Sequence, residues 1–134
     1  MTPFSLKIVT PDGIRFDGQA EELIVRTTTG DMGFLAGHMN CCAPLGMGRA
    51  TVVTDGVKRY AACIGGMVSV VDGAVSLVPT TFEWAENIDV ARAERSLERA
   101  QSVLDNKTST DTDIMLAKAR LRRALIRKDV GTTK

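Results

Sequence analysis

Short apolar and polar runs alternate along the first 80 residues, a pattern typical of β-strands that bury one face. Residues 4–8 alternate strictly and predict a half-buried strand, and residues 22–27 predict another. The remaining expected strands are short apolar runs at residues 14–16, 41–45, 49–54, 58–64, 67–71 and 74–78.

Turn-forming pairs separate these runs, since aspartate starts a turn well and glycine accepts positive φ. A longer glycine-rich stretch, Gly30 to His38, is expected to be a loop. The expected turns are Asp12-Gly13, Asp17-Gly18, Asp55-Gly56, Gly65-Gly66 and Asp72-Gly73. Their spacing predicts an antiparallel β-sandwich or flattened barrel.

The composition changes abruptly between Thr81 and Ala93. Eleven of the 12 glycines and all four prolines lie at or before Pro79. Such a break indicates a domain boundary or a change of architecture. We therefore expect a β-sandwich domain over residues 1–84 and an α-helical domain over residues 85–134, giving a β + α fold.

Apolar residues in the second part recur every three or four positions, as on one face of a helix. Asn87 is the expected N-cap of the first helix, with Asp89 in its positive first turn. A polar break at residues 105–110 precedes a second helix, so the two should form an antiparallel hairpin. Alanine alternates with larger residues on both stripes, Val90-Ala93-Leu97-Ala100-Leu104 and Ile114-Ala117-Leu121-Ala124. An alanine seam buries little area, so the hairpin should be marginally stable by itself.

Charge and composition exclude several classes of function. The net charge is +1 and aromatic residues make up 4%, which disfavours nucleic acid as a partner. Basic side chains outnumber acidic ones by 11 to eight in residues 86–134. Their arginines form two rows at helical spacing, Arg92, Arg95 and Arg99, then Arg120, Arg123 and Arg127. These rows suit a polyphosphate or an acidic partner surface, or form a solvated basic face.

Catalytic and metal-binding motifs are missing from the sequence. His38 is the one histidine, and we expect it at the surface or in an interface. Cys41, Cys42 and Cys63 have no C-x-x-C spacing, so we expect buried free thiols and no zinc site. No run has signal-peptide or membrane-span character. The chain is therefore expected to be a soluble protein that is not an enzyme; a small hydrolase has no support in the sequence.

Several short segments together resemble the epsilon subunit of bacterial F-type ATP synthases across essentially the full length. The segments are residues 9–13 (VTPDG), 30–38 (GDMGFLAGH), 43–45 (APL), 65–66 (GG) and 88–93 (IDVARA). The resemblance implies a non-catalytic central-stalk rotor subunit that couples proton translocation to ATP synthesis. Its sandwich would bind the gamma subunit and the c-ring, with Asp31 and His38 at that interface.

The resemblance also implies a regulatory hairpin, which inhibits ATP hydrolysis when it extends toward the alpha/beta head. The protein would be peripheral, on the cytoplasmic face of the bacterial plasma membrane, and held there only through the complex. Ala36 stands where proline is common, and Cys41 and Cys42 where relatives carry other residues.

A nucleotide-binding motif of some relatives, I/L-D-x-x-R-A, is intact here. It implies regulatory ATP, with or without magnesium, and no required cofactor. The implied contacts are Glu83, Ile88, Asp89, Arg92, Ala93, Arg99, Arg123 and Arg127. The alternative function is a free-standing nucleotide-sensing adaptor, which rests only on the two arginine rows.

Overall fold

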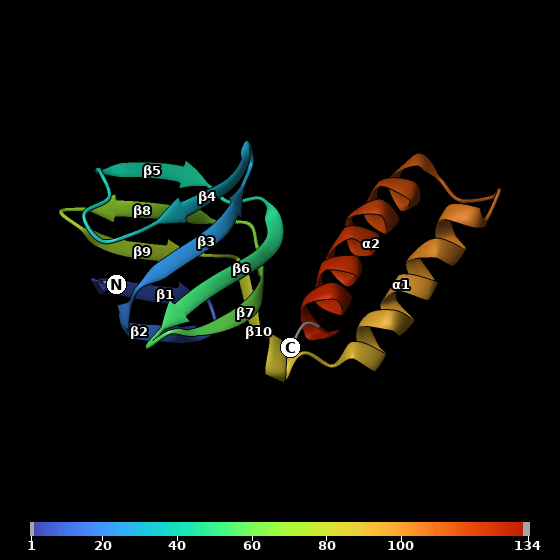
Figure 1. Cartoon of the computed structure of the whole chain (residues 1–134). Coiled ribbons are helices and arrows are strands. Elements are labelled where there is room, and N and C mark those ends of the chain that lie inside the picture. Colours follow the sequence, from blue (N-terminus) through green and yellow to red (C-terminus); the bar gives the residue numbers. More distant parts are fainter. Residues whose placement is uncertain (1, 133–134) are drawn as a thin grey trace. The chain divides into compact units, whose positions relative to one another are not determined.

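The computed structural model describes residues 2–132 and divides the chain into two compact units, Met1–Trp84 and Ala85–Lys134. The first unit contains only strands, and the second contains a 3₁₀ turn and two helices (Figure 1). The observed fold confirms the expected β + α class, a β-sandwich followed by a helical hairpin.

Ten strands form two five-stranded sheets, ordered β2-β1-β9-β8-β5 and β10-β7-β6-β3-β4. Neighbouring strands are antiparallel except β1 and β9, which are parallel. The strands are β1 (Phe4–Thr10), β2 (Gly13–Ala20), β3 (Glu22–Thr27), β4 (Gly30–Phe34), β5 (Cys41–Pro44), β6 (Met47–Thr54), β7 (Val57–Ile64), β8 (Met67–Val71), β9 (Ala74–Val78) and β10 (Thr81–Trp84).

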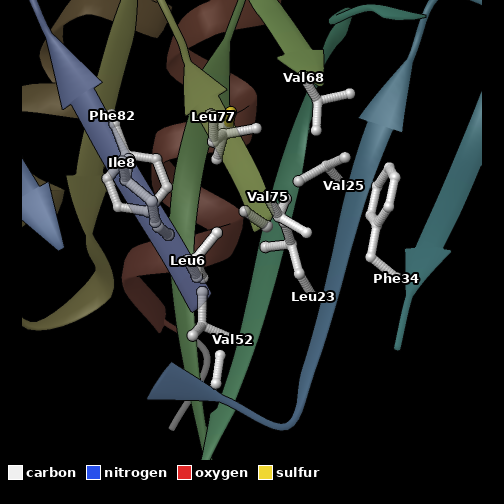
Figure 2. Close-up of a cluster of buried hydrophobic side chains, with 14 of the residues drawn as sticks. Leu6, Ile8, Leu23, Val25, Phe34, Val52, Val68, Val75, Leu77 and Phe82 are labelled. Atoms are coloured by element: carbon white, nitrogen blue, oxygen red, sulfur yellow. The ribbon is translucent and has the colours of Figure 1, made fainter. Parts of the chain in front are cut away.

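Aliphatic and aromatic side chains from both sheets fill the space between them (Figure 2). Alternation along β1 buries Phe4, Leu6 and Ile8 and exposes Ser5 and Lys7. Such alternation fixes the register, because a slip of one residue would move every apolar side chain to the solvent. Residues with no exposed surface include Leu6, Ile8, Leu23, Val25, Phe34, Val52, Val68 and Leu77.

Two of the expected hairpin turns have the geometry their sequence predicts. Asp55 and Gly56 have φ of 51° and 76°, and Asp72 and Gly73 have φ of 50° and 81°. Successive positive φ values are those of type I′ turns, which suit the twist of antiparallel hairpins.

The expected turn at Asp17-Gly18 was wrong. Both residues lie inside β2, where they pair with Lys7 and Leu6 of β1. The chain has already reversed before Gly13, and the long ladder with β1 keeps it extended. A β-bulge opposite Ile8 and Val9 absorbs the irregularity.

Two segments near expected boundaries are more regular than the sequence suggested. Gly30–Phe34, expected within a loop, forms β4, because its backbone pairs with β3 despite two glycines. Thr81–Trp84 forms β10 at the edge of the second sheet and buries Phe82 and Trp84. A four-residue strand is too short for periodicity to reveal.

The helical unit contains a 3₁₀ turn (Ala85–Asn87), α1 (Val90–Asp105) and α2 (Asp111–Thr132). Asp89, and not Asn87 as expected, is the N-cap of α1, and its carboxylate accepts a hydrogen bond from the Arg92 backbone at 3.0 Å. Asn87 is unavailable for this role because the 3₁₀ turn contains it. None of the helices within residues 2–132 has the length and apolar character that crossing a bilayer requires.

Thr110 and Asp113 start α2 with a capping box. The Thr110 hydroxyl accepts from the Asp113 backbone at 3.1 Å, and the Asp113 carboxylate accepts from the Thr110 backbone at 3.2 Å. The two helices run antiparallel (Figure 1), and most of their buried positions are alanines. Ala93, Ala100, Ala117 and Ala124 are buried, whereas Leu97, Leu104, Ile114 and Leu121 are half-buried.

Candidate functional site

Asp31 lies on the exposed start of β4, directly opposite Arg26 of β3. The Arg26 Nε atom donates to Asp31 Oδ1 at 2.7 Å, and the two side chains are 51% and 57% exposed. A cross-strand ion pair of this kind holds the carboxylate in one orientation while leaving it accessible to a partner.

Two glycines of the neighbouring chain segment allow close packing against Arg26 and Thr27. A Cβ atom on Gly48 would lie 2.6 Å from Arg26 Cβ, and one on Gly46 would lie 3.1 Å from the Thr27 carbonyl oxygen. The Gly46 backbone also donates to the Arg26 carbonyl at 2.9 Å. The stem of Arg26 therefore lies against bare backbone, which limits the directions its guanidinium can take.

His38 lies in a turn after β4 and is half-buried. Its backbone donates to Leu35 O at 3.2 Å, and its Nδ1 lies 2.9 Å from Met39 O. Its ring packs on Phe34, with centroids 4.9 Å apart, and Cys41 Sγ lies 3.9 Å from Nδ1. His38 thus shapes this turn as well as presenting an edge to solvent.

Asp31 and His38 do not form one cluster. Asp31 is the second residue of β4, whereas His38 follows the strand and packs on Phe34, the last residue of β4. Each residue of an extended strand spans about 3.3 Å, so roughly 10 Å separates Asp31 from Phe34 alone. The predicted interface residues would therefore mark the two ends of a contact surface along β4.

Ile88, Asp89 and Ala93 of the predicted nucleotide motif have structural roles in the helical unit. Ile88 is 8% exposed and Ala93 is fully buried in the seam. Asp89 caps α1 through one carboxylate oxygen and is otherwise exposed. The side chains of Ile88 and Ala93 can therefore shape a site, but they offer no polar group to a ligand.

The arginines of the motif supply accessible positive charge. Arg92, Arg99 and Arg123 are exposed, and their guanidinium groups form no ion pair with any residue between 2 and 132. Arg127 is half-buried on α2. With the alanine seams facing each other in an antiparallel pair, helical geometry puts both arginine rows on the same face of the hairpin. That face suits phosphate oxygens.

Glu83, the remaining predicted contact, belongs to the other unit. It lies on β10 opposite Ala62 of β7, between the buried Phe82 and Trp84. Strand alternation directs its side chain away from the sandwich core.

The cysteines differ in environment, and only one matches the expectation of burial. Cys63 is buried in the core, Cys41 is half-buried and Cys42 is exposed on β5. Burial raises the pKa of Cys63 from 9.0 to about 12, because the thiolate would be desolvated. The adjacent pair on one strand points to opposite faces, so at least one thiol had to face outward.

Arg26 and Gly131 are not among the residues that the sequence pattern predicted to matter. Only the strand register reveals the Arg26–Asp31 pair, whereas Gly131 could have been noticed as the one glycine after Gly73. Across the described part of the chain, the structure groups no three histidine, cysteine or acidic side chains in a way that could hold a metal ion.

Comparisons with known proteins match both units in the same order. Residues 3–85 match the family model of the ATP synthase delta/epsilon chain β-sandwich domain, and residues 86–130 match that of the long α-helix domain. The ATP synthase epsilon chain of Ruminococcus albus is 41% identical and covers 100% of both chains. That of Bacillus velezensis is 41% identical and covers 98% of both.

The fold is also found in solved structures. A chain of the Euglena gracilis mitochondrial ATP synthase superposes with a TM-score of 0.84 over 96% of this chain and 81% of that one, at 22% identity. A chain of the Tetrahymena thermophila enzyme superposes with a TM-score of 0.65 over 96% of both, at 14% identity. These structures show a shared fold, and the sequence matches extend over the same two units. The chain therefore belongs to the ATP synthase epsilon-chain family.

Proposed function

We propose that this protein is the non-catalytic central-stalk subunit that couples proton translocation to ATP synthesis and restrains ATP hydrolysis. The observation that supports this most strongly is the 41% identity to an ATP synthase epsilon chain over the full length of both chains. The proposed partners are the gamma subunit, the c-ring and the alpha/beta head. The subunit would lie on the cytoplasmic face of the bacterial plasma membrane, held by the complex.

A reconstitution tests this role. The purified chain is added to a bacterial ATP synthase head prepared without this subunit but with gamma, and ATP hydrolysis and co-elution with gamma are measured. Stoichiometric co-elution with lowered hydrolysis is the expected result. A chain that neither binds gamma nor changes hydrolysis would contradict the role and favour a free-standing nucleotide-sensing adaptor.

The β4 surface is the proposed ring contact. Asp31 is exposed and oriented by Arg26, and the turn holding His38 follows the same strand. Ring binding should weaken for Asp31→Ala and, separately, for His38→Ala, since Asp31 lies near the start of β4 and His38 lies beyond its end. Unchanged binding in both variants would move the ring contact to another surface.

The arginine face of the hairpin is the proposed regulatory ATP site. Arg92, Arg99 and Arg123 offer exposed guanidinium groups, to which phosphate oxygens bind well. ATP at this face would stabilise the folded hairpin and so oppose inhibition, because a ligand favours the conformation it binds. The site would need no catalytic group, in keeping with a non-enzymatic subunit.

Asp89 requires a control that separates its helix cap from any contact with ATP. Asp89→Ala removes both the cap and the charge, whereas Asp89→Asn keeps a good N-cap and removes only the charge. Calorimetric titration with ATP, with and without magnesium, should show binding lost in Asp89→Ala. Binding retained in Asp89→Asn would assign the effect to capping; binding lost in both would assign it to the carboxylate charge.

A further inference from the structure

Gly131 occupies an unusual position for a glycine, in the last turn of α2. Glycine lowers helix stability there relative to alanine, because it loses more backbone freedom on folding. It is also not one of the glycines with positive φ, so its backbone conformation is open to any residue. Neither helix propensity nor backbone conformation therefore favours glycine at position 131, and the packing around it does.

The start of the helical unit packs directly against the Gly131 backbone. A Cβ atom at Gly131 would lie 2.7 Å from Val90 Cγ2, 3.0 Å from Ile88 Cγ2 and 3.3 Å from Ile88 Cβ. Both neighbours are β-branched and stiff at χ1, so they cannot rotate away easily. Ile88 is also buried, at 8% exposure, which leaves it little space to move into. An added methyl group would therefore push the start of α1 away from the end of α2.

This contact lies at the base of the hairpin, where it joins the two ends of the unit. Ile88 and Asp89 begin the nucleotide motif. The Arg92 backbone N–H donates a hydrogen bond to Asp89 Oδ1, with 3.0 Å between the nitrogen and the oxygen. Glu94 and Lys128 add only an exposed ion pair across the helices, with 3.9 Å between charged atoms. Exposed pairs contribute little. The close packing at Gly131 thus joins the start of α1 and the residue Ile88 before it to the end of α2, next to the motif.

We propose that Gly131 is a positioning residue, which holds the Ile88–Arg92 segment against α2 and thereby couples closure of the hairpin to nucleotide binding. This coupling rests on the proposed regulatory ATP site. Alanine at position 131 strengthens α2 as an isolated helix but weakens the closed pair, so the two effects can be measured separately. If ATP binds only the closed hairpin, the apparent affinity for ATP is proportional to the fraction of molecules whose hairpin is closed. Any loss of closed hairpin therefore weakens ATP binding in the same proportion.

The packing is tested on the full-length chain with spin labels at two exposed positions, Glu98 on α1 and Leu125 on α2. The three native cysteines are replaced by alanine, and circular dichroism checks that helices are retained. Gly131→Ala should add a population with longer label distances, whereas Thr132→Ala, one residue further on, should not. Val90→Ala in the Gly131→Ala background removes the nearest clashing methyl and should restore the original distances. Unchanged distances in Gly131→Ala would overturn the proposal.

The coupling is tested by titrating the same variants with ATP. The Gly131→Ala variant should bind ATP roughly tenfold more weakly than the wild type, the change that corresponds to modest overpacking. The double variant Gly131→Ala with Val90→Ala should recover the wild-type affinity for ATP. Equal ATP affinity in the wild type and Gly131→Ala, with altered distances, would overturn the coupling alone. If the wild-type chain binds no ATP, the proposed nucleotide site is wrong and the coupling with it, while the label distances still decide whether Gly131 holds the hairpin closed.

Discussion

The two units of this protein bury very different side chains. The sandwich encloses large residues with no exposed surface, among them Leu6, Leu23 and Phe34. In the hairpin, most of the buried positions are alanines, while Leu97 and Leu121 remain half-buried. A fully buried leucine or phenylalanine contributes about 1.5–3 kcal/mol, whereas an alanine methyl contributes under about 1 kcal/mol. The sandwich is therefore expected to be rigid and the hairpin to open more easily.

This difference suits the proposed roles of the two units, in which the sandwich is a fixed anchor and the hairpin is a regulatory element. Segments that change conformation come from the less stable part of a protein, since opening must cost little. In the hairpin, close approach of small residues gives a defined packing without a large energy of burial. A surface for a permanent partner is better placed on the sandwich, where strand register fixes residues such as Arg26 and Asp31.

The largest expected effect comes from truncating a core leucine in each unit. Leu23→Ala should lower the free energy of unfolding of the sandwich by about 2–5 kcal/mol. Leu121→Ala, at a half-buried position, should cost the hairpin about 1 kcal/mol and leave the sandwich unchanged. Denaturant unfolding followed by tryptophan fluorescence for Trp84 and by helical circular dichroism separates the two. If one substitution lowered the free energy of unfolding equally by both probes, the two units would unfold together.

The second prediction concerns the arginine face of the hairpin, the proposed ATP site. Arg92→Ala and Arg123→Ala should each weaken ATP binding by about 1.5–3 kcal/mol, the range for losing a hydrogen bond to a charged group. Arg122→Ala is the matched control, because it removes the same charge from an exposed neighbouring position on another side of α2. Calorimetry gives the affinities. Equal weakening by all three variants would indicate general charge attraction in place of a site.

The third prediction concerns the Arg26–Asp31 pair on the sandwich. Arg26→Ala should lower the free energy of unfolding by about 0.2–1 kcal/mol, typical of a cross-strand ion pair. A double-mutant cycle with Asp31→Ala isolates the pair, and the second substitution should cost less once the first is made. Additive losses would show that the two side chains do not stabilise each other in solution.

The smallest effects concern the thiols. Cys42 should react with a thiol reagent in the folded protein, whereas Cys63 should react only on unfolding, because burial raises its pKa to about 12. In the unfolded chain this thiol ionises near its ordinary value of 9.0, so stability should fall as the pH rises above that value. Cys63→Ala should remove that part of the pH dependence. Rapid labelling of Cys63 in the native protein would contradict its burial.

The sequence predicted well the features that depend on neighbouring residues, and less well those that depend on strand pairing or on irregular turns. Alternation and Asp-Gly pairs predicted most strands and the turns at Asp55 and Asp72, since these depend on neighbouring residues. The turn at Asp17-Gly18 was wrong because pairing with β1 outweighs local turn preference. The role of Asp89 as N-cap depends on a 3₁₀ turn that periodicity does not reveal.

The candidate site shows the same limit. The arginine rows could be recognised from helical spacing, and all of their members are exposed except Arg127, which is half-buried. The register that pairs Arg26 with Asp31, and the contact of Gly131 with Ile88, join residues from different elements. Such contacts depend on three-dimensional packing, and a single sequence shows no periodic pattern that would predict them.

The most direct test of a rigid sandwich joined to an easily opened hairpin is native-state amide hydrogen exchange on the intact protein. Amides in Val90–Asp105 and Asp111–Thr132 should exchange through opening that costs clearly less free energy than opening of the central strands β1 and β6. Equal protection of the helices and these strands would contradict the account, because the hairpin would then open only when the whole protein unfolds.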